Sequence, residues 1–422
     1  MESSQLKRSH QSGGEEGSNF FYLKVDFNRS ATSNREGVLA IQPNQLDGLT
    51  IVLDLYQLLP SFRMRIQDSA GVITHLIPLD KDLSRVFITF GGVVLPGLEN
   101  TSEYYFDVYR AFPSSNNIYE VIGTLVAKEL LSVDRVRSFS GTVKSTIESI
   151  SEESEMNGSE VSGSLEFKKA IVQPGWTNAK LLNYLKTTLQ GSSREGSFYS
   201  FVKIQGTDKY LVFKSYKDFA MSGVKFRFQL GGNPSYEIDS DEYYFPIFEF
   251  KAYDNYKIVA AFGSRSRNYS YYDYTNGKFV VDTVKLVGNS DSREDFYSLT
   301  ERFLIDGSDS QTDCMTLNNC GRDSDFRGRV LGQYHDDLLG LSKLWITTFG
   351  IHTISPGDIV DILFLEHLIP GKEFGCNYHG YWMVERVIHM MGHTYLTRLL
   401  LTRCGVTSSQ DSTLIKATKR KK

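Results

Sequence analysis

Four pieces near the C-terminus decide the fold. They read Ser355-Pro-Gly-Asp358, Ile359-Val-Asp-Ile-Leu-Phe364, Gly380-Tyr-Trp-Met-Val-Glu-Arg-Val-Ile-His389 and Thr394-Tyr-Leu-Thr-Arg-Leu-Leu-Leu-Thr-Arg403. Proline followed by glycine is typical of a tight turn, and the other three pieces have the apolar content and length of strands. Met391-Gly392-His393 supplies a turn between the last two. The pieces therefore predict a turn, a strand, a loop and two further strands.

The residues just upstream predict a helix that leads into this β region. Leu331, Tyr334, Leu338, Leu341 and Trp345 are spaced as one apolar face of a helix over residues 328–345. A short strand, residues 346–349, is expected to follow it.

The first third of the chain predicts a compact β domain. In Phe21–Phe27, apolar residues alternate with polar ones, which is the pattern of a half-buried strand. Turn dipeptides such as Gly91-Gly92 separate further candidates. These are Thr50–Leu58, Ser61–Gln67, Val72–Ile77, Arg85–Phe90, Tyr104–Phe112 and Ile118–Val126. Short strands at this spacing predict a small barrel or sandwich.

The middle of the chain mixes helical and strand patterns. Helices are expected over 139–150 and 176–189, with polar Ser151–Glu160 as an exposed loop. The expected strands are 198–204 and 209–213, then 243–253 and 257–264, then a Tyr-rich hairpin over Tyr269–Phe279 with Asn276-Gly277 at its turn. Residues 290–324 are polar, and Asp306–Asp313 is expected to be loop.

Composition limits the function classes. The formal net charge is −4 and the pI near 6.1, so a broadly basic nucleic-acid-binding surface is not indicated. The 13% aromatic content favours β structure. Met1–His10 lacks the apolar segment of a secretory signal, and no apolar run has the length of a membrane span. The four cysteines form no CxxC pair, so free thiols and synthesis in a cytoplasm are expected.

The order of turn, strand, loop, "G-x-W-x-V-x-x-V-x-H", turn and "T-x-L-x-L-x-R" resembles the tube domain of phage tail hub proteins, above all the baseplate central hub of contractile-tailed phages. Type VI secretion spike proteins share that domain. Upstream, Pro174-Gly-Trp176 with the helix and hairpin that follow is similar to the middle domain of this family, and residues 253–285 are similar to the start of its second tube domain. The likeness covers roughly 20–405 and is strongest over 346–405. The N-terminal tail and the polar insertion near 290–324 depart from the family pattern.

This resemblance implies a structural protein of the virion tail, made in the host cytoplasm. Hubs of the family are homotrimers in which each chain supplies two similar barrels, so that a pseudo-sixfold ring meets the hexameric tail tube above and the central spike below. The implied fold is β-dominated α+β, with two small tube-type barrels and α/β insertions. The expected parts are a disordered tail (1–18), a first tube domain (19–135), a middle domain (136–240), a second tube domain (241–289 and 346–405), an insertion (290–345) and a basic tail (406–422).

No active site, cofactor or metal is expected, and the candidate functional residues are interface residues. They lie in strands 359–364 and 380–390, segment 394–403 and the Tyr-rich hairpin, and they are Tyr271, Tyr272, Tyr274, Trp382, Val384 and His389. His389 and His393 have the HxxxH spacing of a zinc helix, but a turn between strands would not place both imidazoles on one side. His335-Asp-Asp337 is expected on a solvated helix face, and Asp306, Asp309 and Asp313 lack the ligand order of an EF-hand.

Two other classes of function remain open from the sequence. One is a tail enzyme that degrades cell-wall carbohydrate, for which no compact helix-rich module with an isolated catalytic Glu is visible. The other is a receptor-binding tail module that uses the Tyr-rich hairpin to stack on glycans.

Overall fold

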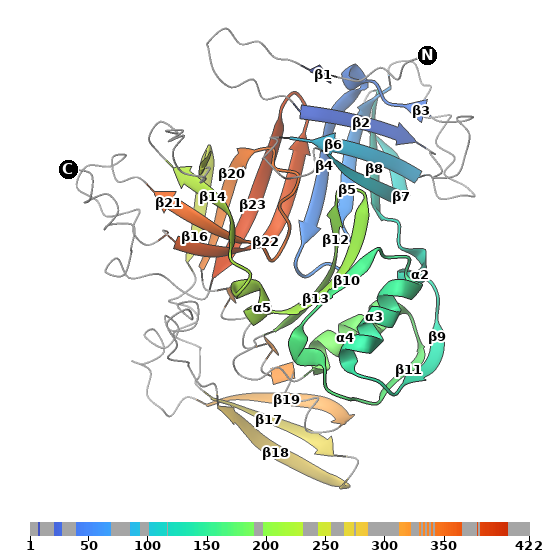
Figure 1. Ribbon diagram of the computed structural model, residues 1–422, viewed down its shortest axis with the longest axis vertical. Helices are drawn as coiled ribbons and strands as arrows, with labels where there is room; N and C mark the ends of the chain where they lie inside the picture. Colours follow the sequence, from blue (N-terminus) through green and yellow to red (C-terminus); the bar gives the residue numbers. More distant parts are fainter. Residues whose placement is uncertain are drawn as a thin grey trace, which may run out of the picture.

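The computed structural model of the chain describes residues 7–8, 21–27, 39–68, 85–92, 101–115, 117–189, 197–230, 244–254, 266–273, 276–285, 312–321, 329–330, 332–333, 336, 339–340, 342–364, 378 and 380–403. Strands dominate these residues, and the helices gather in the middle of the chain (Figure 1). The predicted β-dominated α+β fold class is therefore confirmed, whereas the number of barrels stays a prediction.

Fifteen strands form one continuous sheet with the order β1-β2-β6-β7-β8-β5-β4-β22-β21-β14-β15, while β3 pairs with β2, β23 with β22, β20 with β23 and β16 with β20. Its N-terminal members are β1 (Lys7–Arg8), β2 (Phe21–Phe27), β3 (Leu39–Ala40), β4 (Leu46–Asp54), β5 (Ser61–Gln67), β6 (Arg85–Gly91), β7 (Ser102–Ser115) and β8 (Ile118–Leu125). The others are β14 (Val224–Leu230), β15 (Tyr244–Pro246), β16 (Glu249–Asp254), β20 (Ser342–Phe349), β21 (Ile359–Phe364), β22 (Gly380–Met391) and β23 (Tyr395–Arg403).

The two halves of this sheet meet where β4 pairs antiparallel with β22. The register runs from Asp54 opposite Arg386 to Leu49 opposite Met391. The same β22 pairs with β21 at its start and with β23 along most of its length, with a bulge at Glu385. One long strand thus connects the N-terminal strands to those that carry the C-terminal motif.

The sheet curls so that its β2–β6 end also packs against the C-terminal strands. The ring of Phe90 lies 5.2 Å from that of His389 and 5.7 Å from that of Tyr395, measured between centroids. The Gly92 N–H donates to Nδ1 of His352 at 3.2 Å. This seam, together with the β4–β22 pairing, encloses the largest apolar core, in which Ile51, Phe90 and Val387 are among the residues with no exposed surface.

The turn Ser355-Pro-Gly-Asp358 is built as its sequence predicts. Gly357 has φ +84°, as position i+2 of a type II turn requires, and Asp358 N–H donates to Ser355 O at 3.2 Å. The Asp358 carboxylate accepts from Ser355 N–H at 2.9 Å and from Lys225 Nζ at 2.6 Å. Lys225 belongs to β14, which lies in the segment expected to be the middle domain and pairs parallel with β21. The turn therefore fixes the entry of β21 beside β14.

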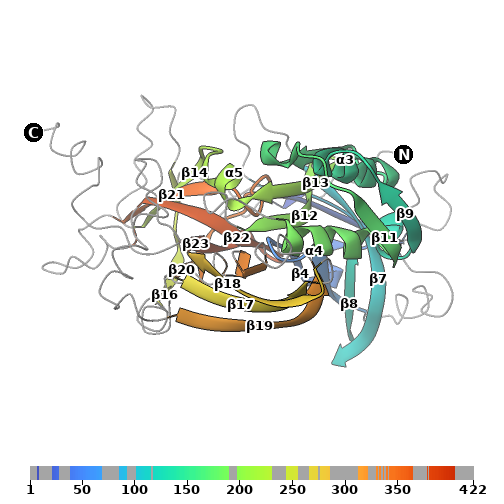
Figure 2. The same ribbon diagram turned by 90° about the horizontal axis from the view of Figure 1, so that it is seen from below.

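The part of the chain between β8 and β14 forms an α+β unit, which lies beside the main sheet (Figure 2). Its helices are α2 (Lys128–Leu131), α3 (Val143–Glu153), α4 (Asn178–Thr188) and α5 (Tyr216–Ala220), and its strands are β9 (Arg135–Phe139), β10 (Gly158–Val161), β11 (Ile171–Trp176), β12 (Phe198–Gln205) and β13 (Asp208–Ser215). Two 3-10 turns occur at Pro43–Gln45 and Gly163–Leu165. Thr142 and Thr177 cap α3 and α4 by accepting backbone N–H bonds, so both predicted helices are confirmed with slightly shifted bounds.

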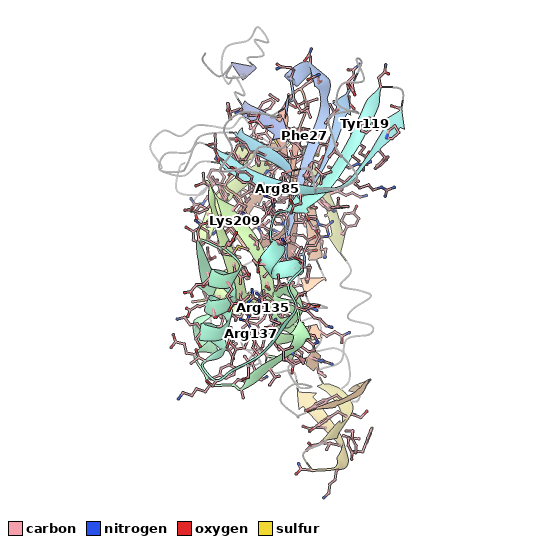
Figure 3. All side chains as sticks on the ribbon, turned by 90° about the vertical axis from the view of Figure 1, so that its right-hand side faces the viewer. Phe27, Arg85, Tyr119, Arg135, Arg137 and Lys209 are labelled. Atoms are coloured by element: carbon pink, nitrogen blue, oxygen red, sulfur yellow. The ribbon has the colours of Figure 1, made fainter. Side chains whose placement is uncertain are left out.

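A polar network holds the β9–β11 ribbon to these helices. Figure 3 shows Arg135 and Arg137 next to each other in this unit. Arg137 donates to Gln173 Oε1 at 2.8 Å, to Asn178 Oδ1 at 3.0 Å and to the Glu153 carboxylate. Burial acts to raise the pKa of Glu153, but the two arginines lower it below its usual value. The network ties the ribbon to both α3 and α4.

A separate three-stranded sheet consists of β17 (Ser266–Asp273), β18 (Lys278–Lys285) and β19 (Thr312–Gly321), with the order β18-β17-β19. It lies below the rest of the molecule in Figure 1. The Tyr-rich hairpin is thereby confirmed as β17 and β18, with Gly277 at φ +62° in its turn. The loop expected over Asp306–Asp313 is wrong for Thr312 and Asp313, because both belong to β19, which pairs parallel with β17.

Three other expectations are corrected. The helix expected over 328–345 ends earlier, because Ser342–Phe349 forms β20 and Trp345 lies within it, opposite Leu400 of β23. The loop expected over 151–160 is largely absent, since α3 continues to Glu153 and Gly158–Val161 pairs with β13. The strand expected over 243–253 is split into β15 and β16. Val72–Ile77 and 257–264 lie outside the described residues.

Glu160, one of the polar residues on which the loop prediction for 151–160 rested, forms two ion pairs in the structure. Glu160 of β10 accepts from Lys203 Nζ at 2.9 Å and from Lys214 Nζ at 2.5 Å. Burial would raise its pKa, but hydrogen bonds from Lys214 and Lys203 lower it to about 2. Both lysines come from β12 and β13, which sequence-local patterns do not bring into contact with Glu160.

Replacing Gly357 by alanine is expected to destabilise the chain by about 2–4 kcal/mol, because the left-handed backbone and a steric clash both oppose a side chain. A Cβ at this position would lie 2.4 Å from the ring of Phe219. Gly163→Ala is the matched control, since a Cβ there meets nothing within 4 Å. Denaturant unfolding measures both; equal stabilities of the two variants would contradict this account of the turn.

Replacing Val384 by aspartate should cost about 3 kcal/mol or more, because it places an unpaired charge where no solvent reaches. Val384 is 0% exposed, whereas Tyr381 of the same strand is 54% exposed and serves as the control position. Thermal unfolding should show a large drop for Val384→Asp and a small one for Tyr381→Asp. A Val384→Asp protein as stable as the wild type would refute the placement of β22.

Candidate assembly surface

Three of the predicted interface residues are interior residues of the single chain. Trp382, Val384 and His389 each have 0% exposed surface. The Trp382 indole N–H donates to Tyr378 O at 2.9 Å, and His389 Nδ1 lies 2.9 Å from the Tyr395 hydroxyl. A side chain without exposed surface cannot contact a second copy, so the expectation for these three is corrected: they support the strands from inside.

The Tyr-rich hairpin divides its residues between two faces. Tyr271 is 3% exposed, and its neighbour Tyr272 is 46% exposed and lies opposite Phe279 of β18. Phe279 and Val281 are each 67% exposed on the same face as Tyr272. Tyr274 lies outside the described residues. Of the predicted hairpin residues, Tyr272 is therefore the one that the structure offers to a partner.

A broader exposed surface follows from the register of the main sheet. Directly opposite residues run in one row across six strands: Arg110 (β7), Ile122 (β8), Arg63 (β5), Thr50 (β4), Met390 (β22) and Leu396 (β23). Residues opposite each other in a sheet share a face, so these side chains point the same way. All six are exposed or half-buried, in contrast to core residues such as Ile51 and Met64 between them. We call this the outer sheet face.

Ion pairs on the outer sheet face place the cation above the carboxylate. Arg63 pairs with Glu120 at 2.7 Å, with side-chain exposures of 62% and 4%. Arg386 pairs with Asp54 at 2.5 Å, with exposures of 37% and 2%. The solvent side of this face therefore carries guanidinium groups.

The strand β16 forms one margin of the sheet. Among the described residues it pairs with β20 alone, over Glu249–Asp254. Phe250 and Tyr253 are 40% and 39% exposed, and Phe248 just before the strand is 47% exposed. A strand edge with exposed aromatic residues is a template for pairing with another chain.

The structure supports few groups as chemical sites. His389 is buried, whereas His393 is exposed on the turn after β22. Asp336 accepts a hydrogen bond from the Tyr199 hydroxyl at 3.0 Å, whereas His335, Asp337, Asp306 and Asp309 lie outside the described residues. Among the residues that the structure describes, no cluster of three or more His, Cys, Asp or Glu has a metal-binding arrangement, and no helix is long and apolar enough to span a membrane.

The sequence predictions did not identify the outer sheet face as a candidate surface. Its local signal was present, because Arg63 and Arg65 alternate with buried Phe62, Met64 and Ile66 along the predicted strand 61–67. What the sequence lacks is the cross-strand register that aligns these arginines with residues more than 300 positions away, such as Met390.

Known proteins are similar to this chain in structure but not detectably in sequence. No protein-family model matches the sequence, and neither does any curated protein. A tail protein from Neisseria meningitidis MC58 has a TM-score of 0.50 at 13% identity, over 90% of this chain and 96% of that one. The 43 kDa tail protein of prophage MuSo2 from Shewanella oneidensis has a TM-score of 0.51 at 10% identity, over 91% of this chain and all of that one.

These comparisons define the class of fold. The chain has the fold of phage tail proteins, over nearly its whole length and nearly the whole length of both solved structures. The resemblance inferred from the motif at 346–405 is thereby confirmed for the fold.

Acidification should lower the free energy of unfolding through protonation of His389, which packs against Phe90 and Tyr395. Burial, with a smaller contribution from nearby His352, lowers the pKa of His389 to about 3, whereas an unfolded histidine titrates near 6.5. The unfolded chain therefore binds a proton below pH 6.5 that the folded chain excludes. Stability present above pH 6.5 is expected to be lost as the pH falls toward 3, by up to about 1.4 kcal/mol per pH unit.

This is measured by unfolding free energies at pH 7 and pH 5 for the wild type and for His389→Gln, which keeps an acceptor for Tyr395 but does not titrate. The wild type should lose about 2 kcal/mol more than the variant. An identical loss in both proteins would exclude His389 as the group responsible.

Proposed function

We propose that the chain is a structural subunit of a phage tail baseplate: a hub that trimerises and joins the hexameric tail tube to the central spike. The observation that carries this proposal is the division of the main sheet into two strand sets. The set β2-β6-β7-β8-β5-β4 comes from the first third of the chain, and the set β22, β23, β20, β16, β21 and β14 comes largely from its end. Three chains would supply six such sets, as a ring that matches a hexameric tube requires.

The edge of β16 supports assembly into a ring. The side of β16 that pairs with none of the described strands, together with exposed Phe250 and Tyr253, would favour association of an isolated monomer. Closed rotational symmetry covers such an edge with the next copy, without leaving a free end. The fold likeness to two phage tail proteins supports the same proposal, under which the protein would be part of the virion tail.

The role proposed is mechanical, without catalysis or a cofactor. The buried carboxylates Glu120, Asp54 and Asp358 are each paired with a lysine or arginine, as structural ion pairs are. The proposed partners are the tail tube above and the central spike below. The two tube-type domains in each chain are also part of the proposal.

The solution mass tests the proposal directly. Light scattering coupled to size exclusion should give a species of about 143 kDa, three times the 47.8 kDa of the chain. Phe250→Lys with Tyr253→Lys should shift this species toward the monomer, because two added charges would oppose pairing at the β16 edge. A wild-type monomer that persists even when mixed with purified tube and spike proteins would overturn the hub assignment.

A further inference from the structure

The outer sheet face combines exposed cations with half-buried apolar side chains. Its basic residues are Arg63, Arg65, Arg110, Arg386 and Arg398, from four different strands. The apolar residues between them are Val52, Ile122, Trp345, Ile388, Met390 and Leu396. Cross-strand pairs such as Ile388 opposite Val52 and Arg398 keep the two kinds of side chain in contact on one surface.

Acidic groups on this face are mostly recessed. Glu120 and Asp54 lie below their arginines with 4% and 2% of their side chains exposed. Asp47 is exposed at 43%, but it pairs with Arg65 at 3.1 Å. Asp107, opposite Thr124 on the same face, is 20% exposed and pairs with Arg85 at 3.1 Å, and exposed Glu249 stands at the far margin on β16. The face is therefore cationic toward solvent, although the whole chain has a net charge of −4.

We propose that the outer sheet face binds an acidic polypeptide surface of a partner protein. Charge complementarity selects an acidic partner, because Arg63 and Arg386 project beyond the carboxylates beneath them and Arg110 is exposed. The interspersed Trp345, Met390 and Ile388 select a protein over a nucleic acid, since arginine, methionine and aromatic residues are typical of protein interfaces. Arg398 stacks on Trp345 with its guanidinium carbon 4.9 Å from the ring centre, a rigid contact surface at the β23–β20 end of the face.

This proposal rests on the proposed function only for the place of the partner, which would be another component of the same tail. The surface itself follows from register and burial. The two proposals therefore fail separately.

The test measures binding of two fluorescent probes to the full-length protein by polarisation: a peptide of about 20 residues that alternates glutamate with leucine and serine, and single-stranded DNA of about the same length. The variant Arg65→Glu with Arg110→Glu reverses two exposed charges while leaving the buried Glu120 and Asp54 paired. The control, Lys168→Glu with Lys217→Glu, makes the same change in net charge at exposed positions of the α+β unit. Thermal melts of both variants verify folding.

The wild type should bind the acidic peptide more tightly than the DNA. The reversed variant should lose at least about tenfold in peptide affinity, and the control less than about twofold. Equal losses in the reversed variant and the control would mean that only overall charge matters, and would overturn the proposal. Tighter binding of DNA than of peptide would assign the face to nucleic acid instead. A trimer of about 143 kDa that binds neither probe would remove this proposal and leave the tail role standing.

Discussion

The pairing of β4 with β22 is the contact on which the rest of the structure depends. It joins Leu49–Asp54 to Arg386–Met391, two segments separated by more than 300 residues. The register is held at one end by the Arg386–Asp54 ion pair, whose carboxylate also accepts from the Tyr56 backbone N–H at 2.9 Å. A shift by one residue would turn Ile51 and Leu53 to solvent and bring Thr50 and Val52 into the core. The core and the outer sheet face are thus fixed by the same register.

Much of the fold was accessible from the sequence because its signals are local. The strands Phe21–Phe27, Ser61–Gln67 and Ile359–Phe364 have the bounds expected from their alternation or apolar content. The turn at Pro356-Gly357 could be predicted from the sequence because proline followed by glycine is typical of a tight turn. The ends of helices were harder to predict from the sequence, as Trp345 illustrates. Its spacing from Leu331 fits a helix, but the same residue also fits a strand that begins at Ser342. Pairing of this segment with β23 and β16 decides in favour of the strand.

The candidate site was only partly predictable, since sequence patterns do not separate an interior aromatic residue from an interface one. Trp382 and Val384 look alike in either role, and only the packing of β22 among β21, β23 and β4 shows that they are interior. In the Tyr-rich hairpin, alternation predicts that neighbouring tyrosines face opposite sides, but not which side is covered. Tyr272 is exposed because it pairs with Phe279 on the open face, while Tyr269 and Tyr271 stack together with their ring centres 5.8 Å apart on the buried one.

The recessed carboxylate beneath a more exposed cation recurs across the main sheet. It is found for Lys24 above Asp26, Lys343 above Glu385 and Lys225 above Asp358, with exposures of 36% and 3%, 29% and 6%, and 43% and 9%. The cation of each pair offsets part of the cost of burying its carboxylate, and keeps part of its own charge in water. A sheet built in this way gains a cationic exterior without a cationic sequence. Net charge therefore says little about which partners such a surface attracts, and the register of the strands says more.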